Sequence, residues 1–257
     1  MDTAAIRVPS ELDPVAPVGR MALPAPGDPP LLWLVDAARH EAFAARLASD
    51  VLDPRELRSA AAFRADADRD CYRAAHVALR LLLGAQLGTA PGDVRLVRED
   101  CPGCGEPHGR PAVAGGGVHF SLSHSGSFAL LAFAATPVGV DVETVPSADA
   151  VADISSVMHR VEIAELGALE PPERPAAFAR AWVRKEAYLK GLGIGLGRDP
   201  SADYVGTGEA PAAGSAGWSI ADVAVGENRA AAVAVADPDP AGTATPQATA
   251  ATQATAH

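Results

Sequence analysis

The chain has 257 residues, of which 48% are hydrophobic and 21% charged, so it can bury a substantial core. This composition excludes a disordered or fibrous protein for most of its length. The formal net charge of -11 disfavours sequence-independent binding of nucleic acid, because the field of the protein repels polyanions. The sequence has no apolar run of membrane-helix length, no signal-peptide pattern and only three cysteines. We therefore expect a cytoplasmic protein that does not bind membranes.

Apolar runs and turn residues divide the chain into an irregular arm at 1–30, two α+β halves at 31–137 and 138–236, and an Ala/Thr/Pro-rich tail at 237–257 that is expected to be disordered. The first half is predicted to contain a strand at 31–35, helices at 37–52 and from Pro54, a long helix at 68–87 ended by Gly88, and strands at 93–98, 118–123 and 128–134. The second is predicted to contain a strand at 138–142, helices at 148–160, 161–169 and 174–192, and strands at 218–225 and 229–236.

Helices followed by strands occur twice in this order, which suggests an internal duplication. The segments 128–137 (FALLAFAATP) and 229–238 (RAAAVAVADP) have the same length and pattern, and each ends in an X-Pro step. We predict two similar halves packed into one body, with a cleft between them where ligand sites tend to lie. Since one chain supplies both halves, we expect a monomer.

Two acidic residues alternate with valine in the predicted strand at 138–142. Asp141 and Glu143 are two positions apart, so both carboxylates project from one face while Val140 and Val142 point into the core. Such a pair suits a hard divalent cation such as Mg²⁺. The alternative is an ordinary strand end with a polar outer face.

The two lysines of the chain lie close together on one predicted helix. Of the 21 lysine and arginine residues, all except Lys185 and Lys190 are arginine. These two lysines are five positions apart. Glu186 and Lys190 share a helix face, with Trp182 one turn earlier. They could supply a metal ligand or general base together with a positive charge for a phosphate. A surface ion pair, with lysines retained by codon bias, is the alternative.

A small-residue turn at Ser123-His124-Ser125 joins two predicted strands. A Ser-His nucleophile pair is conceivable, but the G-x-S-x-G elbow of serine hydrolases is absent. Hydroxyls, backbone N–H groups and an imidazole are better suited to holding a phosphate.

The segment 51–80 is the one locally basic stretch in the chain. Arg69 and Arg73 lie one helical turn apart, and His76 and Arg80 continue along the same helix, so these side chains could bind a phosphate. The alternative is a solvated helix face with internal ion pairs.

A metal-ligand spacing occurs in the turn-rich segment 101–111, where Cys101, Cys104 and His108 form C-x₂-C-x₃-H. A closed structural zinc site needs four ligands, and no second C-x₂-C exists. Turn chemistry explains the segment without a metal, so the zinc reading stays open as the less favoured one.

Three motifs in order, Ser123-His124-Ser125, Gly139-x-Asp141-x-Glu143 and Trp182-x₂-Lys185-Glu186-x₃-Lys190, resemble the signature of the surfactin-type (Sfp-like) 4′-phosphopantetheinyl transferases. The resemblance covers about residues 31–236, and the CPGCG turn resembles actinobacterial members. It implies an α+β fold of two pseudo-twofold-related halves with coenzyme A (CoA) held in the cleft between them. It also implies transfer of the phosphopantetheine arm of CoA to a serine of an apo acyl or peptidyl carrier protein, with release of adenosine 3′,5′-bisphosphate.

The resemblance also implies roles for individual residues. Mg²⁺ is expected on Asp141, Glu143 and Glu186, and Glu186 or a metal-bound water is expected to take the serine proton. The CoA-binding residues are expected to be Arg58, Arg110, Ser123, His124, Lys185 and Lys190, with Lys190 facing the phosphates and His124 near the 3′-phosphate. One departure is Cys71, which stands where many members carry a basic residue, so neighbouring Arg69 or Arg73 would have to substitute for it.

Two other classes of function also fit parts of the sequence. A metal-dependent phosphodiesterase or nuclease could use clustered Asp and Glu with a Lys, although the net charge disfavours it. A non-catalytic module that docks carrier proteins would need no metal site.

Overall fold

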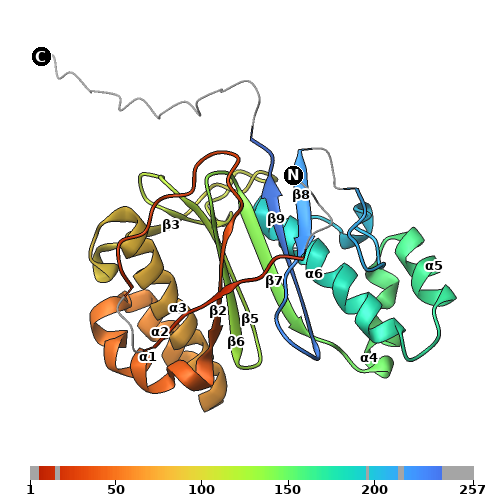
Figure 1. Ribbon diagram of the computed structural model, residues 1–257, viewed down its shortest axis with the longest axis horizontal. Helices are drawn as coiled ribbons and strands as arrows, with labels where there is room; N and C mark the ends of the chain where they lie inside the picture. The colour runs from red at the N-terminus through yellow and green to blue at the C-terminus, as the bar shows by residue number, and fades with distance from the viewer. Residues whose placement is uncertain (1–5, 15–17, 195–196, 214–216, 239–257) are drawn as a thin grey trace, which may run out of the picture.

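The computed structural model describes residues 6–14, 18–194, 197–213 and 217–238, and these form one body of helices and sheets (Figure 1). The N-terminal half contains β1 (Ser10–Glu11), β2 (Leu31–Asp36), α1 (Ala37–Val51), α2 (Pro54–Ala62), α3 (Asp66–Leu87), β3 (Leu96–Arg98), β4 (Pro111–Val113), β5 (His119–Ser125) and β6 (Phe128–Ala134). The C-terminal half contains β7 (Val138–Thr144), α4 (Ala148–Ile154), α5 (Arg160–Ala168), α6 (Arg174–Leu192), β8 (Trp218–Asp222) and β9 (Arg229–Ala236). The predicted α+β class is confirmed.

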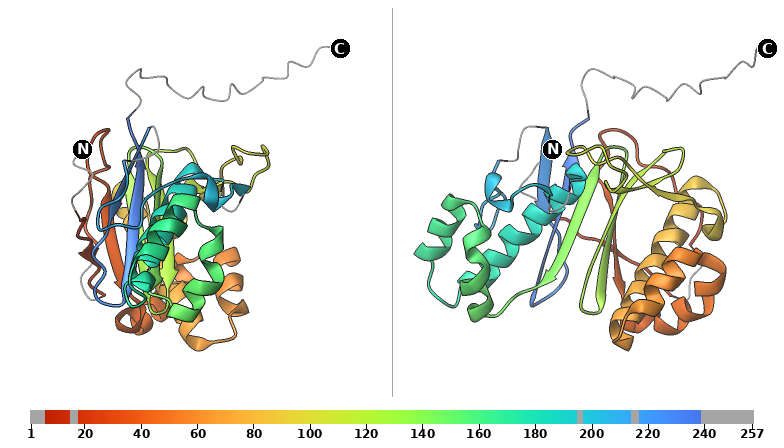
Figure 2. Two further views of the ribbon diagram at one scale, coloured as in Figure 1. Left: turned by 90° about the vertical axis from the view of Figure 1, so that its right-hand side faces the viewer. Right: turned by 180° about the vertical axis from the view of Figure 1, so that it is seen from behind.

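The strands form two main sheets, ordered β1-β2-β6-β5 and β7-β9-β8, and β3 pairs with β4 in a separate hairpin. Helices α1–α3 cover one sheet and α4–α6 cover the other, so the helices lie on opposite flanks of the molecule (Figures 1 and 2). Each sheet packs its helix-facing side chains into a core of its own. The opposite faces of the two sheets share a third apolar cluster, which includes Leu130 of β6, Val140 of β7 and Val233 of β9.

The local chemistry of the helix ends agrees with the sequence. Asp53 caps α2 by accepting from the N–H groups of Arg55 and Glu56, and Glu56 returns a capping-box contact to the Asp53 N–H. Gly88 ends α3 in the left-handed conformation, with φ of 68°. These are the start and stop signals predicted above, so the helices of the first half form where the sequence places them.

The N-terminal arm is more ordered than the sequence suggests. Ser10 and Glu11 pair in parallel with β2, and Leu12 is buried in the first core. Earlier in the arm, Arg7 pairs with Val223, just after β8 in the other half. The arm therefore crosses from one sheet to the other, and the expectation of an irregular segment is wrong at these positions. Such pairing is set by distant strands, which the arm's own sequence does not reveal.

Other differences concern element ends. The predicted strand at 93–98 is shortened to β3 by a 3₁₀ turn that includes Pro91, and the helix expected at 148–160 stops at Ile154. At the C-terminal end, Asp237 still donates its N–H to Gly217 O, so the folded part continues past 236. The rest of the predicted tail, from 239, lies outside the described residues. No helix among those described is long and apolar enough to span a membrane.

Candidate functional site

An acidic cavity of about 420 Å³ lies where β5, β7 and α6 meet. Its lining residues are Leu122, Ser123, His124, Asp141, Glu143, Trp182, Glu186 and Lys190. The three motifs that were singled out from the sequence therefore contribute to one cavity, although more than sixty positions separate the first from the last.

Backbone geometry explains how the carboxylates reach this cavity. In β7 the side chains of Val140 and Val142 enter the apolar cluster between the sheets, so Asp141 and Glu143 project toward α6. Gly139 allows α6 to approach closely, because a Cβ atom at this position would lie 2.0 Å from Ala187 O. Because position 139 has no Cβ atom, α6 lies close enough to β7 for Glu186 and Lys190 to line the same cavity as Asp141.

Asp141 is the centre of a buried hydrogen-bond network. It is 2% exposed, and its Oδ1 accepts from Ser123 Oγ at 2.7 Å and from Lys190 Nζ at 2.6 Å. Lys190 Nζ also donates to Ser123 Oγ at 2.9 Å. The other oxygen, Asp141 Oδ2, is buried and has no hydrogen-bond partner among the described residues. A buried acceptor without a partner is costly, so this oxygen is prepared for a ligand.

Burial raises the pKa of all three carboxylates, and charge repulsion adds to the shift for Glu143 and Glu186. Burial raises the pKa of Asp141, and the Lys190 ammonium opposes this shift. Burial, followed by repulsion from Asp141, raises the pKa of Glu186, and Glu143 adds further repulsion. The pKa of Glu143 is raised mainly by burial as well. Negative charge is thus concentrated here at a free-energy cost that a bound cation would reduce.

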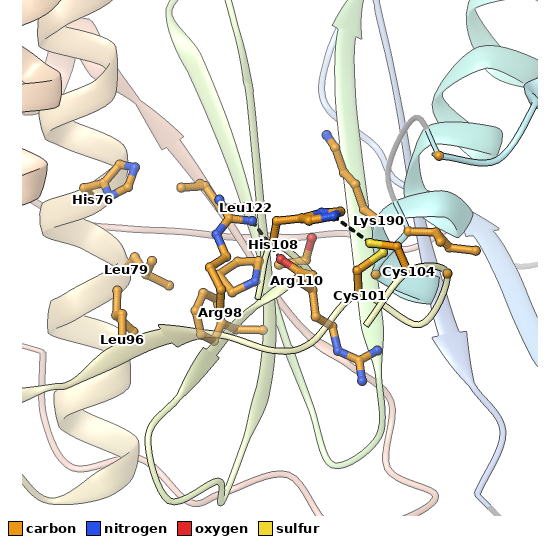
Figure 3. Close-up of a pocket in the computed structure, with 18 of the residues that line it drawn as sticks. His76, Leu79, Leu96, Arg98, Cys101, Cys104, His108, Arg110, Leu122 and Lys190 are labelled. Atoms are coloured by element: carbon orange, nitrogen blue, oxygen red, sulfur yellow. Dashed lines mark hydrogen bonds between the residues drawn. The ribbon is translucent and has the colours of Figure 1, made fainter. Parts of the chain in front are cut away.

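A larger cavity of about 850 Å³ adjoins the acidic one and shares Leu122, His124 and Lys190 with it. It is lined from both halves of the chain by His76, Leu79, Leu96, Arg98, Cys101, Gly103, Cys104, His108, Gly109, Arg110, Pro111, Phe120, Ser121, Leu122, His124, Lys190, Gly193, Ile194 and Gly197. Figure 3 shows His76 and Leu79 on α3 at one side of it, and Lys190 on α6 at the other.

Two arginines of the β3–β4 hairpin line the larger cavity. Arg110 donates from Nη1 to Gly191 O at 2.7 Å and forms an ion pair with Glu99, which ties the hairpin to the end of α6. Arg98 donates to Gly109 O at 2.9 Å. Arg110 was predicted from the sequence as a binding residue, whereas Arg98 was not. Only the pairing of Arg98 with Pro111 across the hairpin brings Arg98 to the cavity, and no local motif marks that pairing.

Two histidines that line the larger cavity, His76 and His124, differ in their contacts. Desolvation, with repulsion from His76 and Lys190, lowers the pKa of His124, so its imidazole is neutral at pH 7. His76 is held by Glu56 at 2.9 Å and stacks on Tyr72. An anion bound near His124 would favour the protonated ring.

Lys185 does not reach either cavity, and here the expectation of a CoA-binding residue needs correction. Its side chain is 1% exposed and forms an ion pair with Glu162 at 2.8 Å. Its ammonium also donates to the carbonyls of Pro200 and Asp203. Position 185 is one step around the helix from 186, and that step turns the side chain into the core instead of the cavity.

The expected basic residues of the first half also lie apart from the described cavities. Arg58 is exposed on α2. Arg69 and Arg73 pair with Asp66 and Asp70 on the surface of α3, which matches the alternative of internal ion pairs. Cys71, at the position where a basic residue was expected by resemblance, is buried, and burial raises the pKa of its thiol to about 11. From α3, the residues that line the larger cavity are His76 and Leu79.

Comparison with known proteins identifies the family. A model of the 4′-phosphopantetheinyl transferase superfamily matches residues 137–212, which include Asp141, Glu143, Glu186 and Lys190. The 4′-phosphopantetheinyl transferase HetI from Nostoc sp. is 32% identical over 216 residues, or 80% of this chain and 86% of that protein. The chain belongs to the 4′-phosphopantetheinyl transferase superfamily.

This phosphopantetheinyl transferase is also similar to two other transferases over shorter stretches of the chain. The transferase AcpT from Salmonella typhimurium is 36% identical over 132 residues, which cover 50% of the chain and 64% of AcpT. The transferase Sfp from Bacillus subtilis is 28% identical over 122 residues, which cover 47% of the chain and 50% of Sfp. The predictions of an Sfp-like family member and of a 4′-phosphopantetheinyl transferase as the enzyme class are therefore confirmed.

Proposed function

We propose that this enzyme transfers the 4′-phosphopantetheine arm of CoA to a serine hydroxyl of an apo acyl or peptidyl carrier protein, with Mg²⁺ in the acidic cavity. The observation that carries the proposal is the junction of two cavities at Lys190: one holds three carboxylates, and the other has two arginines and an apolar wall. A diphosphate bound at this junction would lie between a metal site and several cations, which is the arrangement that phosphoryl transfer requires.

The acidic cavity fits a hard divalent cation. Asp141 Oδ2 is buried without a hydrogen-bond partner among the described residues, and Glu143 and Glu186 line the same cavity. Carboxylate oxygens are the ligands that Mg²⁺ prefers, and Mg²⁺ usually takes one or two of them besides substrate phosphates. Asp141, Glu143 and Glu186 would hold the ion, which would neutralise charge on the diphosphate.

The remaining residues act on CoA and on the carrier serine. Lys190 would exchange its present contact with Asp141 for the diphosphate, while Ser123 and His124 contact CoA phosphates. Arg110, and with it Arg98, would lie beside the nucleotide portion in the larger cavity. Arg58 on α2 has no described contact with the cavity, so it is left out of this proposed CoA site.

Glu186 is the proposed general base, because its carboxylate lines the cavity in which the serine hydroxyl would meet the diphosphate. The serine oxygen forms a bond to the phosphorus that carries the pantetheine arm. The bond from that phosphorus to the bridging oxygen breaks, and its electron pair leaves with adenosine 3′,5′-bisphosphate. The serine proton passes to the Glu186 carboxylate, so charge and atoms balance.

We further propose that the boundaries 31–137 and 138–236 separate two pseudo-twofold-related halves, with CoA held in the cleft between them. The larger cavity takes residues from both sides of position 137, including His124 and Lys190. Because a single chain supplies both walls, the enzyme is proposed to act as a monomer. Its proposed location is the cytoplasm.

The test is labelling of a purified apo carrier protein with a fluorescent CoA. We expect Mg²⁺-dependent transfer of the label to the carrier and release of adenosine 3′,5′-bisphosphate in equal amount, with no transfer to a carrier whose serine is replaced by alanine. Labelling that is unaffected by EDTA would overturn the metal assignment. Hydrolysis of nucleic acid without labelling would favour a nuclease, and carrier binding without labelling would favour a docking module.

A further inference from the structure

Three side chains of the β3–β4 hairpin converge beside the larger cavity, in a cluster that the proposed transfer reaction does not use. One potential ligand atom from each of Cys101, Cys104 and His108 lies within 4.8 Å of the other two. Cys104 Sγ and His108 Nε2 are 3.0 Å apart. Figure 3 shows the three side chains gathered on the α6 side of the cavity, with Cys104 joined to His108.

Backbone hydrogen bonds fold the chain around Cys101 into a tight turn. Gly105 N–H donates to Cys101 O at 2.8 Å, and Cys101 N–H donates to Glu106 O at 2.7 Å. Gly105 has φ of 78°, in the left-handed region that glycine adopts without strain. The turn holds the sulfurs of Cys101 and Cys104 close together, as the C-x₂-C spacing of a metal site requires.

We propose that Cys101, Cys104 and His108 form a second metal site, which binds Zn²⁺ with three protein ligands and leaves a fourth position open to solvent. Two sulfurs and an imidazole match the ligand preference of Zn²⁺ and not that of Mg²⁺. The ligand count in the sequence disfavoured zinc, because a closed site needs four ligands. A site with three protein ligands and a water satisfies the same tetrahedral geometry.

The position of the site indicates what the ion does. Its ligands belong to the segment between Arg98 and Arg110, the two arginines of the larger cavity. A Cβ atom on Gly103 would lie 3.3 Å from the Ile194 side chain, so this turn already packs on the segment after α6. Zn²⁺ would close the turn at low entropy cost and fix the hairpin against the second half, which holds both arginines in place.

Metal binding to the full chain is measured directly, with no need for enzyme activity. The protein is reduced with a phosphine, freed of metal and titrated with Co²⁺ and then Zn²⁺. We expect one equivalent of Co²⁺ to bind with the sulfur-to-metal charge-transfer and visible bands of tetrahedral thiolate coordination, and Zn²⁺ to displace it. Because ligand thiols lose protons on binding, the apparent affinity should rise with pH.

Cys104→Ser and His108→Ala are the test variants, because both side chains are exposed and their replacement leaves the core intact. Each should lower the apparent affinity at least tenfold and weaken the cobalt bands. Cys71→Ala is the control thiol, buried in α3, and Asp141→Asn is the control for the acidic cavity. Both controls should bind Co²⁺ as the wild type does.

Several results would overturn the proposal: no binding by the fully reduced chain, wild-type affinity in Cys104→Ser or His108→Ala, or loss of the cobalt bands in Cys71→Ala or Asp141→Asn. A Cys101–Cys104 disulfide in the purified protein that, once reduced, yields no metal affinity would assign the pair to redox chemistry instead. None of these readouts depends on transferase activity, so they separate this site from the proposed Mg²⁺ site.

Discussion

Both halves pack a long helix on a sheet, but they do so with side chains of different size. In the first half, Leu131 and Phe133 of β6 point into the core beneath the helices. In the second half, the β9 side chains that face α6 are the alanines at 230, 232 and 234, and β7 contributes Gly139. Small side chains let α6 settle close to its sheet, and the close approach brings carboxylates of strand and helix into one cavity.

The strongest test of this contrast is removal of one carboxylate from each half. Asp141→Asn should lower the transfer rate at least about a thousandfold, since loss of one preorganised charged group costs ~10²–10³ and the metal ligand is lost as well. Melting temperature should change little, because Asn keeps the shape of the side chain. Steady-state labelling across a Mg²⁺ series measures the rate.

Asp66→Asn is the matched control in the first half. Asp66 pairs with Arg69 on the surface, with its own side chain 82% exposed. Such a pair contributes at most ~1 kcal/mol, so rate and melting temperature should both stay near wild type. A large loss of rate in this control would contradict the division of roles between the halves.

The contact between α6 and β7 is tested by adding one carbon. Gly139→Ala would place a Cβ atom 2.0 Å from Ala187 O and 2.4 Å from Gly191 N, so the helix must move away. Overpacking of this kind costs ~1–3 kcal/mol of stability, and a displacement of about 1 Å in the site can cost ~100-fold in rate. Denaturant unfolding and labelling measure the two effects.

Gly167→Ala is the corresponding control, because a Cβ atom there meets nothing within 4 Å and the residue lies in α5. Alanine in a helix is favoured over glycine by up to ~1 kcal/mol, so this variant should be slightly more stable and fully active. If Gly139→Ala and Gly167→Ala had the same stability and the same transfer rate, the close packing of α6 on β7 would not be what positions the site.

The two lysines of α6 provide a third comparison, between a cavity position and a core position. Lys190→Arg should lower the rate at least tenfold, about 1.4 kcal/mol, because a planar guanidinium misplaces the charge, while melting temperature stays constant. Lys185→Arg should do the reverse: its side chain is enclosed with Glu162 at 2.8 Å, so the larger group lowers melting temperature more than rate. Wild-type kinetics for Lys190→Arg would contradict the role of Lys190.

The smallest expected effect concerns pH. The folded state raises the pKa of Glu186, so the folded protein binds this proton more tightly than the unfolded chain does. Wild-type stability should therefore fall as pH rises from 4.5 through the raised pKa. Metal-free Glu186→Gln lacks this loss, so its melting temperature should exceed that of the wild type by on the order of 2 °C at pH 7 and match it at pH 4.

Scanning fluorimetry in EDTA measures this difference, and Mg²⁺ should reverse it by stabilising the wild type alone. The exposed Glu227, changed to Gln, is the control, and this variant should respond to Mg²⁺ as the wild type does. If Glu186→Gln were less stable than the wild type at neutral pH without metal, the proposed repulsion among the carboxylates would be wrong.

The sequence predicted those parts of the fold and site that depend on neighbours along the chain. The alternation of Asp141 and Glu143 with valine and the helical spacing of Glu186 and Lys190 place both pairs on faces that meet in the structure. Lys185 was misplaced because one residue step decides between cavity and core, and its partner Glu162 lies on α5. Arg98 was missed because the hairpin pairing that brings it to the cavity depends on distant residues.

The arm that pairs at both ends has a consequence for synthesis. Arg7 leaves the ribosome early, but its partner Val223 is among the last folded residues to emerge. Until β9 emerges, Leu130 and the rest of the apolar face of β6 are covered only in part, since β7 and β9 together complete that cluster. A nascent chain therefore exposes apolar surface from the synthesis of β6, about half-way along the chain, until β9 has been made. The arm can pair across both sheets only after nearly the whole chain has been made.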